Sequence, residues 1–383
     1  MRILQIHPLM KSEALSPAAG GMARASLQLT RLLIERGHEV QVMPIPEGLG
    51  SRELWEVAPG RTVEVAAVMH IPAWKDGAWL PRALMRLRPL PVGIKNYFYD
   101  ALALTAFRRE LQIFHPDIIH NHLARRPFPR LAHALGVRGN LVLTHHHGET
   151  GDALDAYRRI VFPSRAACEL IAAESRYPAK RTRVIYNPVA PIFGEPQPER
   201  NHPRNGILFV GAVRKRKGID LLLDAYRSDR RLRKEPLFLC GAGEDMALVD
   251  EAVAEGLPVH PLGKLAPAEV AAHLRTAKLV VIPSRLEGFS IAILEAICSG
   301  APVVAWAPQV REVEALLGLS IGAPFDGRTQ TAQDLAAAIQ SVLEGDPMAA
   351  ADRRRMAEAA RAAFSEERCV DAYLELYREL KGE

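Results

Sequence analysis

Short apolar runs alternate with segments of helical periodicity along most of the chain, and this alternation restricts the fold more than any other feature. The runs have the length of buried strands, and those in the second half are each followed by a helical pattern. This order is typical of parallel βαβ units, so we expect an α/β protein with doubly wound parallel sheets. The predicted strands are Ile3–Ile6, Val40–Met43, Val63–Val68, Asp117–His120, Leu141–Thr144, Ile160–Phe162, Arg183–Ile185, Ile207–Val210, Leu237–Cys240, Val259–Leu262, Leu279–Ile282 and Val303–Ala305.

One break divides the predicted strands into two series. Residues 190–205 carry four prolines and few apolar side chains, which is typical of a linker. A chain of 383 residues is also long enough for two or three domains, at about 100 to 200 residues each. We therefore predict one Rossmann-like domain from residues 1–189 plus a closing helix in 365–383, and a second from residues 190–364.

The composition excludes several classes of protein. Apolar residues make up 48% and charged residues 24% of the chain, a balance that can fill large cores and differs from that of disordered chains. The four cysteines contain no CxxC pair, so we expect neither a disulfide framework nor a cysteine zinc site, and a reducing cytoplasm suits them. No segment reaches 18 uninterrupted apolar residues, and the start is too polar for a signal peptide, so we expect no membrane span.

The net charge of +5 is unevenly distributed. Residues 1–194 carry a net charge of +9 and residues 195–383 a net charge of −4. Within the basic half, residues 77–99 contain no acid and mix four cations with aromatic and aliphatic side chains, which suits an anionic membrane surface. The alternative is a cleft wall with solvated arginines. We do not expect nucleic-acid binding, because the cations follow no motif that reads nucleic acid.

A run of cations follows the first predicted strand of the second series. Gly211 comes directly after this strand, and four consecutive cations precede Gly218. Ligands of doubly wound sheets bind beyond the carboxyl ends of the strands, and helix N-termini attract anions, so the run predicts a diphosphate site. The alternative is a solvated basic turn. The four cations are Arg214, Lys215, Arg216 and Lys217.

Two glutamates and a glycine follow the predicted strand Leu279–Ile282. Gly288 would let the backbone approach a ligand, and the amides after it would open a helix toward phosphate. If a helix joins Glu287 and Glu295, they lie about 12 Å apart along its axis, which is wider than the roughly 5 to 9.5 Å of a glycoside hydrolase pair. The spacing favours contacts with two ends of a longer ligand. Glu295 has apolar neighbours, which favours a ligand role over an exposed helix position.

Three adjacent histidines, His145 to His147, follow another predicted strand. Extended backbone sends the outer two to one side and His146 to the other, which disfavours a shared metal ion and favours a histidine that contacts substrate hydroxyls. His120 and His122 follow a neighbouring strand in the same way, and we expect structural roles for them.

Two common nucleotide motifs are absent from the sequence. It contains no DxD to hold Mg²⁺ on a nucleotide diphosphate and no GxGxxG after the first strand, so we expect neither a metal site nor a dinucleotide oxidoreductase. The charge of a leaving diphosphate must then be met by protein cations, for which Arg216 and Lys217 are available.

Several shorter motifs accompany the cation run and the two glutamates. They are Gly20-Gly21, Arg36 to Val40, Thr144-x-His146, Ile185 to Pro188, Gly241 to Glu244, Pro283-Ser284 and Gly300 to Val304. Together with the E-x7-E segment, which is the most specific of them, these motifs resemble those of the family 4 retaining glycosyltransferases over nearly the whole chain. The resemblance implies the GT-B architecture, in which two Rossmann-like domains face a cleft.

The resemblance also implies an activity. It is a retaining, metal-independent transfer of a sugar from a UDP- or GDP-linked donor to a saccharide or lipid-linked acceptor, in the synthesis of cell-surface polysaccharide or lipopolysaccharide. The first domain would bind the acceptor and the second the nucleotide sugar, without a cofactor. The enzyme would work in the cytoplasm, on the inner face of the membrane.

Single residues acquire roles from the same resemblance. Glu295 would bind the nucleotide ribose and Glu287 the donor sugar. Lys217 would neutralise the diphosphate, and His146 would contact the sugar near the reaction centre. Further donor contacts are implied for Gly21, Gly211, Gly288, Phe289 and Ser290.

The sequence departs from the family pattern at one place. The family commonly has an arginine directly after the glycine that matches Gly211, where this chain has Ala212. We expect Arg216, next to Lys217, to be the second cation instead. Two other classes remain open, namely a nucleotide-sugar epimerase on the same fold, which needs no acceptor, and a noncatalytic binding partner that has kept the fold.

Overall fold

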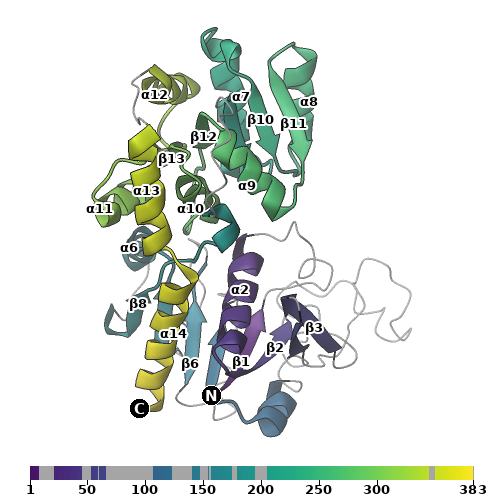
Figure 1. Cartoon of the computed structure of the whole chain (residues 1–383), viewed down its shortest axis with the longest axis vertical. Coiled ribbons are helices and arrows are strands. Elements are labelled where there is room, and N and C mark those ends of the chain that lie inside the picture. Colours follow the sequence, from purple (N-terminus) through teal and green to yellow (C-terminus); the bar gives the residue numbers. More distant parts are fainter. Residues whose placement is uncertain are drawn as a thin grey trace. The chain divides into compact units, whose positions relative to one another are not determined.

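The computed structural model divides into two compact units (Figure 1). Unit 1 comprises Met1–Phe162, Ile171–Ile185 and Val370–Glu383, and unit 2 comprises Pro163–Leu170 and Tyr186–Cys369. Unit 2 therefore includes a short piece of chain from between two parts of unit 1. The structure describes residues 1–7, 21–44, 53–58, 60–65, 107–122, 140–146, 154, 157–174, 179–194, 205–344 and 350–382.

Unit 1 is built on a sheet whose described strands follow the order β3-β4-β2-β1-β5-β6-β7-β8. Neighbours pair in parallel except β3 and β4, which form an antiparallel hairpin at one edge. The strands that were predicted for this half are confirmed as part of a parallel α/β sheet. With β3, which was not predicted, the strands of this sheet are β1 (Arg2–His7), β2 (Glu39–Pro44), β3 (Glu53–Ala58), β4 (Arg61–Val65), β5 (Ile118–Asn121), β6 (Leu141–Thr144), β7 (Arg159–Phe162) and β8 (Thr182–Val184).

Helices of unit 1 bury their apolar faces on this sheet. Helix α2 (Gly21–Glu35) packs Leu29 and Leu33 inward, and the chain leaves it through Gly37, whose φ of +79° suits a glycine at a helix end. Helix α14 (Glu366–Lys381) belongs to unit 1 from Val370 onward and runs beside β6 (Figure 1). The other described helical segments before unit 2 resumes are 107–114, α6 (Arg165–Glu174) and η2 (Ala179–Arg181).

Unit 2 contains a six-stranded parallel sheet in its described residues, with the order β11-β10-β9-β12-β13-β14. In chain order this is 3-2-1-4-5-6, the strand order of dinucleotide-binding folds, and it reverses between β9 and β12. Ligands of such sheets bind at this reversal. The strands are β9 (Ile207–Val210), β10 (Leu237–Cys240), β11 (Val259–Gly263), β12 (Leu279–Ile282), β13 (Val303–Trp306) and β14 (Gly322–Phe325).

Both faces of this sheet are covered by helices, as the doubly wound prediction requires (Figure 1). Ile207 and Phe209 point into one apolar core and Leu208 into the other, because successive strand residues alternate between faces. One core is completed by α7 (Ile219–Ser228), α8 (Met246–Ala254) and α12 (Ala332–Glu344). The other is completed by α9 (Pro267–Thr276), α10 (Ile291–Cys298), α11 (Ala307–Leu317) and α13 (Ala350–Ala363).

Three local features differ from the sequence predictions. Strand β3 was not predicted because its glutamates interrupt the apolar run, and β14 because it contains Pro324, which is tolerated at a sheet edge. The segment 190–205 is not purely a linker, since Pro191–Phe193 forms the 3-10 turn η3 and Phe193 is buried in the unit 2 core. A turn η5 (Leu232–Lys234) also separates α7 from β10.

Candidate active site

The predicted cation run forms a tight turn between β9 and α7. Lys215–Lys217 make up the short 3-10 helix η4, and the N–H of Gly218 donates a 2.9 Å hydrogen bond to the carbonyl of Lys215. Gly218 has a φ of +77°, and a Cβ at this position would lie 2.0 Å from the carbonyl oxygen of Pro283. Because only glycine meets both conditions without strain, it allows the turn to lie against the loop that follows β12.

Lys217 and Glu287 join this cation turn, residues 214–217, to the loop after β12. Nζ of Lys217 lies 2.5 Å from Oε1 of Glu287, which also accepts a 2.6 Å hydrogen bond from Oγ of Ser284. The two charged side chains are only 20% and 7% exposed. Partial burial strengthens their attraction relative to a surface pair. The lysine ammonium carries three donors, so it can serve this carboxylate and an incoming anion at once.

Arg216 and Gly211 also lie at this end of the sheet. The side chain of Arg216 is exposed on the turn beside Lys217. Gly211 directly follows β9, and its carbonyl oxygen would lie 1.8 Å from a Cβ at residue 241, where the chain has Gly241. The loops after β9 and β10 therefore pack backbone against backbone, which accounts for the glycine at residue 241.

Side chains from other segments hold the backbone of residues 288–290. The carbonyl of Gly288 accepts a 2.8 Å hydrogen bond from Oγ of Ser164. Gln309 of α11, which is completely buried, accepts a 2.8 Å bond from the N–H of Ser290 and donates a 3.0 Å bond to its carbonyl. The ring of Phe289 packs on that of Tyr186, with centroids 5.4 Å apart. The loop is thus fixed before any ligand arrives, and the Ser290 amide already has a protein acceptor.

Glu295 lies within α10, whereas Glu287 precedes this helix. The helix begins at Ile291 with Ser290 as its N-cap residue, so one helix does not join the two glutamates and the spacing of about 12 Å expected for that case does not apply. The side chain of Glu295 is only 2% exposed, and its chain neighbours Leu294 and Ala296 are also buried. This burial excludes the exposed helix position, and the ligand role of Glu295 stays a prediction.

Ser164 and Gln309 were not among the predicted site residues, although a sequence motif accompanies Ser164. Pro163-Ser164-Arg165 follows strand β7, and the same three residue types, Pro283-Ser284-Arg285, follow strand β12. The same three residue types thus follow a strand in each half of the chain. Gln309 gave no signal, because nothing in a single helical glutamine indicates which backbone it will bond.

A histidine cluster lies at the carboxyl ends of β1, β5 and β6 in unit 1. It consists of His7, His120, His122 and His146. Nδ1 of His122 lies 3.1 Å from Nε2 of His146, and the rings of His122 and His120 have centroids 4.2 Å apart. The structure thus brings together His146 with both histidines that were expected to be structural.

Hydroxyl groups satisfy the deeper part of this cluster. Nδ1 of His120 lies 2.6 Å from the hydroxyl of Tyr377, and its Nε2 lies 2.7 Å from Oγ1 of Thr144. Thr144 also lies 2.9 Å from the hydroxyl of Tyr373. Helix α14 therefore contributes two tyrosines to the polar network under the strand ends.

Burial keeps these histidines neutral. It lowers the pKa of His7 to about 3 and the pKa values of His120 and His122 well below the ordinary value of 6.5. Neutral imidazoles carry one donor and one acceptor each, so the cluster can exchange hydrogen bonds with hydroxyl groups near pH 7. His146 is the half-buried member, so its ring can reach a ligand at the surface of unit 1.

The remaining predicted residues of unit 1 have varied surroundings. His145 is completely buried with its ring against Phe162, in an environment unlike that of His146. Gly21 is the first residue of α2, and a side chain there would meet open space. His147 and the basic segment 77–99 lie outside the described residues.

The described residues contain neither a candidate metal site nor a membrane-spanning helix. Within them, no group of three or more His, Cys, Asp or Glu side chains has an arrangement that could hold a metal ion. In the same part of the chain, no helix combines the length and apolarity needed to cross a bilayer.

Family models match both halves of the chain. The model described as Glycosyltransferase Family 4 matches residues 19–191, and the model described as Glycosyl transferases group 1 matches residues 195–363. The second match contains the cation turn and both glutamates, and the first contains the histidine cluster except for His7.

Known proteins of similar sequence and structure are glycosyltransferases. A D-inositol 3-phosphate glycosyltransferase from Geodermatophilus obscurus is 28% identical over 98% of this chain and 88% of its own length. The D-rhamnosyltransferase WbpZ from Pseudomonas aeruginosa is 31% identical over 49% of this chain and 54% of its own.

Solved structures show the same fold. Sucrose-phosphate synthase from Thermosynechococcus elongatus has a TM-score of 0.73 at 20% identity and covers 99% of this chain and 98% of its own. HepE from Anabaena, in complex with UDP-glucose, has a TM-score of 0.69 at 18% identity and covers 99% of this chain and 100% of its own. The chain has the GT-B fold and belongs to glycosyltransferase family 4, because the two family models together match residues 19–191 and 195–363.

Proposed function

We propose that this glycosyltransferase is retaining and metal-independent, and that it moves a sugar from a UDP- or GDP-linked donor to a saccharide or lipid-linked acceptor. The observation that carries the proposal is the 2.5 Å Lys217–Glu287 pair, held by Ser284 where the strand order of unit 2 reverses. It fixes a cation and a carboxylate where such sheets bind nucleotides.

The cations of the turn would act on the leaving group. As the bond to the sugar breaks, negative charge grows on the departing diphosphate, and a preorganised ammonium stabilises that charge most in the transition state. Lys217 supplies this charge, and the exposed Arg216 beside it supplies a second. These cations take the place of a metal ion, for which the sequence has no DxD motif.

The other unit 2 residues would hold the rest of the donor. The carboxylate of Glu295 would bind the ribose hydroxyls and that of Glu287 the sugar hydroxyls. Gly211 allows close approach of the backbone at the end of β9, and the amides of Gly288 and Phe289 are the candidates for the sugar and phosphate, since Ser290 already donates to Gln309.

In unit 1, Gly21 and His146 are the proposed contacts. The open space at Gly21 would accommodate part of the diphosphate. His146 would exchange hydrogen bonds with a hydroxyl of the transferred sugar, with its ring oriented by the 3.1 Å contact to His122. We assign residues 1–189 plus 365–383 to acceptor binding and residues 190–364 to donor binding.

Relatives support this donor and acceptor chemistry. HepE was solved with UDP-glucose, and the D-inositol 3-phosphate glycosyltransferases are named for a phosphorylated polyol. WaaG, a glycosyltransferase involved in lipopolysaccharide biosynthesis, has a TM-score of 0.64 with this chain. This similarity and the +9 charge of residues 1–194 support a role in cell-surface polysaccharide or lipopolysaccharide synthesis. The enzyme would work in the cytoplasm, peripheral to the membrane, with residues 77–99 as the membrane contact. We propose no nucleic-acid partner.

A donor panel tests the proposal. UDP- and GDP-sugars are added singly to the wild type and to Glu295→Gln, and the unfolding temperature is measured, since a ligand that binds only the folded state raises it. We expect one group of nucleotide sugars to raise the temperature of the wild type and to raise that of the variant less. A flat response of the wild type to the whole panel would contradict donor binding.

Product analysis separates the remaining alternatives. With the bound donor and a saccharide acceptor, NMR of the product should show retained anomeric configuration, and excess EDTA should leave the rate unchanged. An epimerase would instead convert the donor without any acceptor, and a noncatalytic partner would bind the donor without turnover.

A further inference from the structure

The cation turn places several positive charges close together. Lys215, Arg216 and Lys217 are adjacent, and like charges at this distance repel one another. Two backbone hydrogen bonds close the turn, from Lys217 N to Arg214 O at 2.8 Å and from Gly218 N to Lys215 O at 2.9 Å. Something beyond this short turn must hold the lysine ammonium in register with Glu287.

Arg285 contacts the turn with both its backbone and its side chain. Its N–H donates a 3.0 Å hydrogen bond to the carbonyl of Arg216, and its Nη1 donates to the carbonyl of Lys215. These are the carbonyls of the two residues that precede Lys217. Arg285 itself lies two residues before Glu287, so it links the two loops that carry the charged pair.

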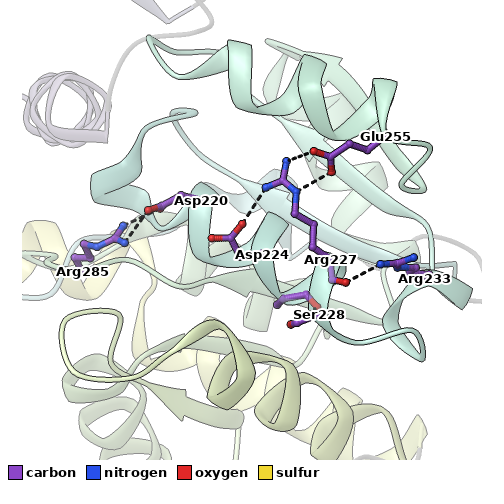
Figure 2. Close-up of polar contacts among 8 residues, drawn as sticks. Asp220, Asp224, Arg227, Ser228, Arg233, Glu255 and Arg285 are labelled. Atoms are coloured by element: carbon purple, nitrogen blue, oxygen red, sulfur yellow. Dashed lines mark hydrogen bonds and ion pairs between the residues drawn. The ribbon is translucent and has the colours of Figure 1, made fainter.

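Asp220 fixes the guanidinium of Arg285 in this position. The two form a bidentate pair, with Nη1 to Oδ1 and Nη2 to Oδ2 both at 2.8 Å (Figure 2). The pair is partly buried, with side chains 32% and 25% exposed. Asp220 sits in the first turn of α7, where a carboxylate also interacts favourably with the helix dipole. A planar guanidinium group that donates hydrogen bonds from both terminal nitrogens has little freedom to rotate.

We propose that Arg285, held by Asp220, is a positioning residue that keeps the Lys217 ammonium aligned with Glu287 for the donor diphosphate. This inference rests on the proposed function for its catalytic consequence, but its structural consequence can be measured without a donor. If Arg285 is replaced, the carbonyls of Lys215 and Arg216 lose the hydrogen-bond donor that they share. The turn then opens more often, and Lys217 spends less time in place.

The same helix offers a matched control. Arg227, near the other end of α7, forms ion pairs with Asp224 at 2.9 Å and with Glu255 at 2.7 Å (Figure 2). Its side chain is 29% exposed, close to the value for Arg285. Removing it therefore breaks a comparable arginine–carboxylate arrangement on α7 without touching the bonds of the cation turn.

The first experiment is hydrogen–deuterium exchange of the free protein in Arg285→Gln, Asp220→Asn and Arg227→Gln. We expect the amides of Lys217 and Gly218 to exchange faster in the first two variants and at the wild-type rate in the third. Unchanged protection of these amides in Arg285→Gln would overturn the proposal, whichever donor the enzyme uses.

The second experiment measures kcat and the donor KM of the same variants and of Arg285→Lys. Because small displacements of catalytic groups are costly, Arg285→Gln should lower kcat by about tenfold to a hundredfold. The double variant with Asp220→Asn should be no slower than Arg285→Gln alone. Arg285→Lys should rescue only part of the rate, since it keeps the charge and loses the fork. Arg227→Gln should stay within about twofold of the wild type.

Three results would contradict positioning. Multiplicative effects of the two single substitutions would mean that Arg285 acts directly on the donor, and so would full rescue by lysine. A loss of unfolding temperature in Arg285→Gln with unchanged kcat would mean a purely structural role. If no donor gives turnover, the proposed function fails, and the exchange experiment still decides whether Arg285 braces the turn.

Discussion

The two units place different chemistry at the same part of their sheets. Beyond the strand ends of unit 1 lies the histidine cluster, in which His122 bonds His146, His120 bonds the hydroxyls of Thr144 and Tyr377, and Thr144 in turn bonds Tyr373. Beyond the strand ends of unit 2 lie full charges, in the pairs Lys217–Glu287 and Arg285–Asp220.

The difference shows two ways in which a fold can keep polar groups in place under burial. An imidazole titrates close to pH 7, so burial alone removes its charge and leaves a neutral donor and acceptor. Ammonium, guanidinium and carboxylate groups instead meet burial by pairing. Under the proposed function, neutral chemistry suits sugar hydroxyls and paired charge suits a diphosphate. Four predictions test this contrast.

The largest effect is expected from removing the central charge of unit 2. Lys217→Ala should lower kcat by about 100- to 1,000-fold, which is typical for the loss of one preorganised group that stabilises transition-state charge. Lys278 offers a control, because it forms an ion pair with Glu235 at 2.7 Å just before the start of β12. Lys278→Ala should change kcat by less than about twofold. Steady-state kinetics with the best donor measures both, and a wild-type kcat for Lys217→Ala would refute the assigned role.

A smaller loss is expected from His146, the half-buried member of the histidine cluster. His146→Ala removes the proposed hydrogen bond to the sugar and should lower kcat/KM by about tenfold to a hundredfold, equivalent to about 1 to 3 kcal/mol. His146→Gln keeps a donor and an acceptor and should recover part of the rate. If both variants match the wild type, the sugar contact lies elsewhere.

The stability of the protein should fall in mild acid because of the buried histidines. The pKa of His7 is lowered to about 3 in the folded protein, whereas its ordinary value is 6.5. Between pH 6.5 and pH 3, His7 is therefore protonated in the unfolded chain and neutral in the folded one. The resulting stability is complete above pH 6.5 and is lost as the pH falls toward 3, by about 1.4 kcal/mol per pH unit for each such histidine. Urea unfolding at pH 7.5, 6.5 and 5.5 measures it.

A substitution identifies this source of the pH dependence. His7→Gln cannot take up a proton between pH 7.5 and 5.5, so its free energy of unfolding should fall less steeply over that range than that of the wild type. An equal slope in the two proteins would assign the effect to other groups.

The smallest effect is expected from one hydroxyl at the edge of the cluster. Tyr373→Phe removes the 2.9 Å contact with Thr144, which keeps its bond to His120. The free energy of unfolding should fall by about 0.5 to 1.5 kcal/mol, as for one ordinary hydrogen bond. Tyr377→Phe should cost more, because it removes the partner of Nδ1 of the buried His120. The reverse order in urea denaturation would contradict this description of the network.

Much of the fold could be predicted from the sequence, since buried parallel strands are continuous apolar runs. The predicted strands Leu141–Thr144, Ile207–Val210, Leu237–Cys240 and Leu279–Ile282 coincide with β6, β9, β10 and β12 residue for residue. The edge strands β3 and β14 were missed, because an edge tolerates the glutamates of β3 and the proline of β14.

The candidate site could be predicted only in part. Placement at strand ends selected Lys217, Glu287 and His146, since strand ends follow directly from the apolar runs. The partners of the site residues, Ser164 and Gln309 among them, could not be predicted. They lie more than 15 residues away in the chain from the backbone that they bond.

The sequence by itself determined which residues carry charge and at which strand ends they stand, because strand periodicity and chain order are local properties. Only the tertiary structure decided which charges meet. The 2.5 Å Lys217–Glu287 pair joins residues 70 positions apart, and the Arg285–Asp220 ion pair joins residues 65 positions apart. Such pairings follow from the sheet order, which sets β9 beside β12. That order is a property of the whole packed sheet and not of any single segment.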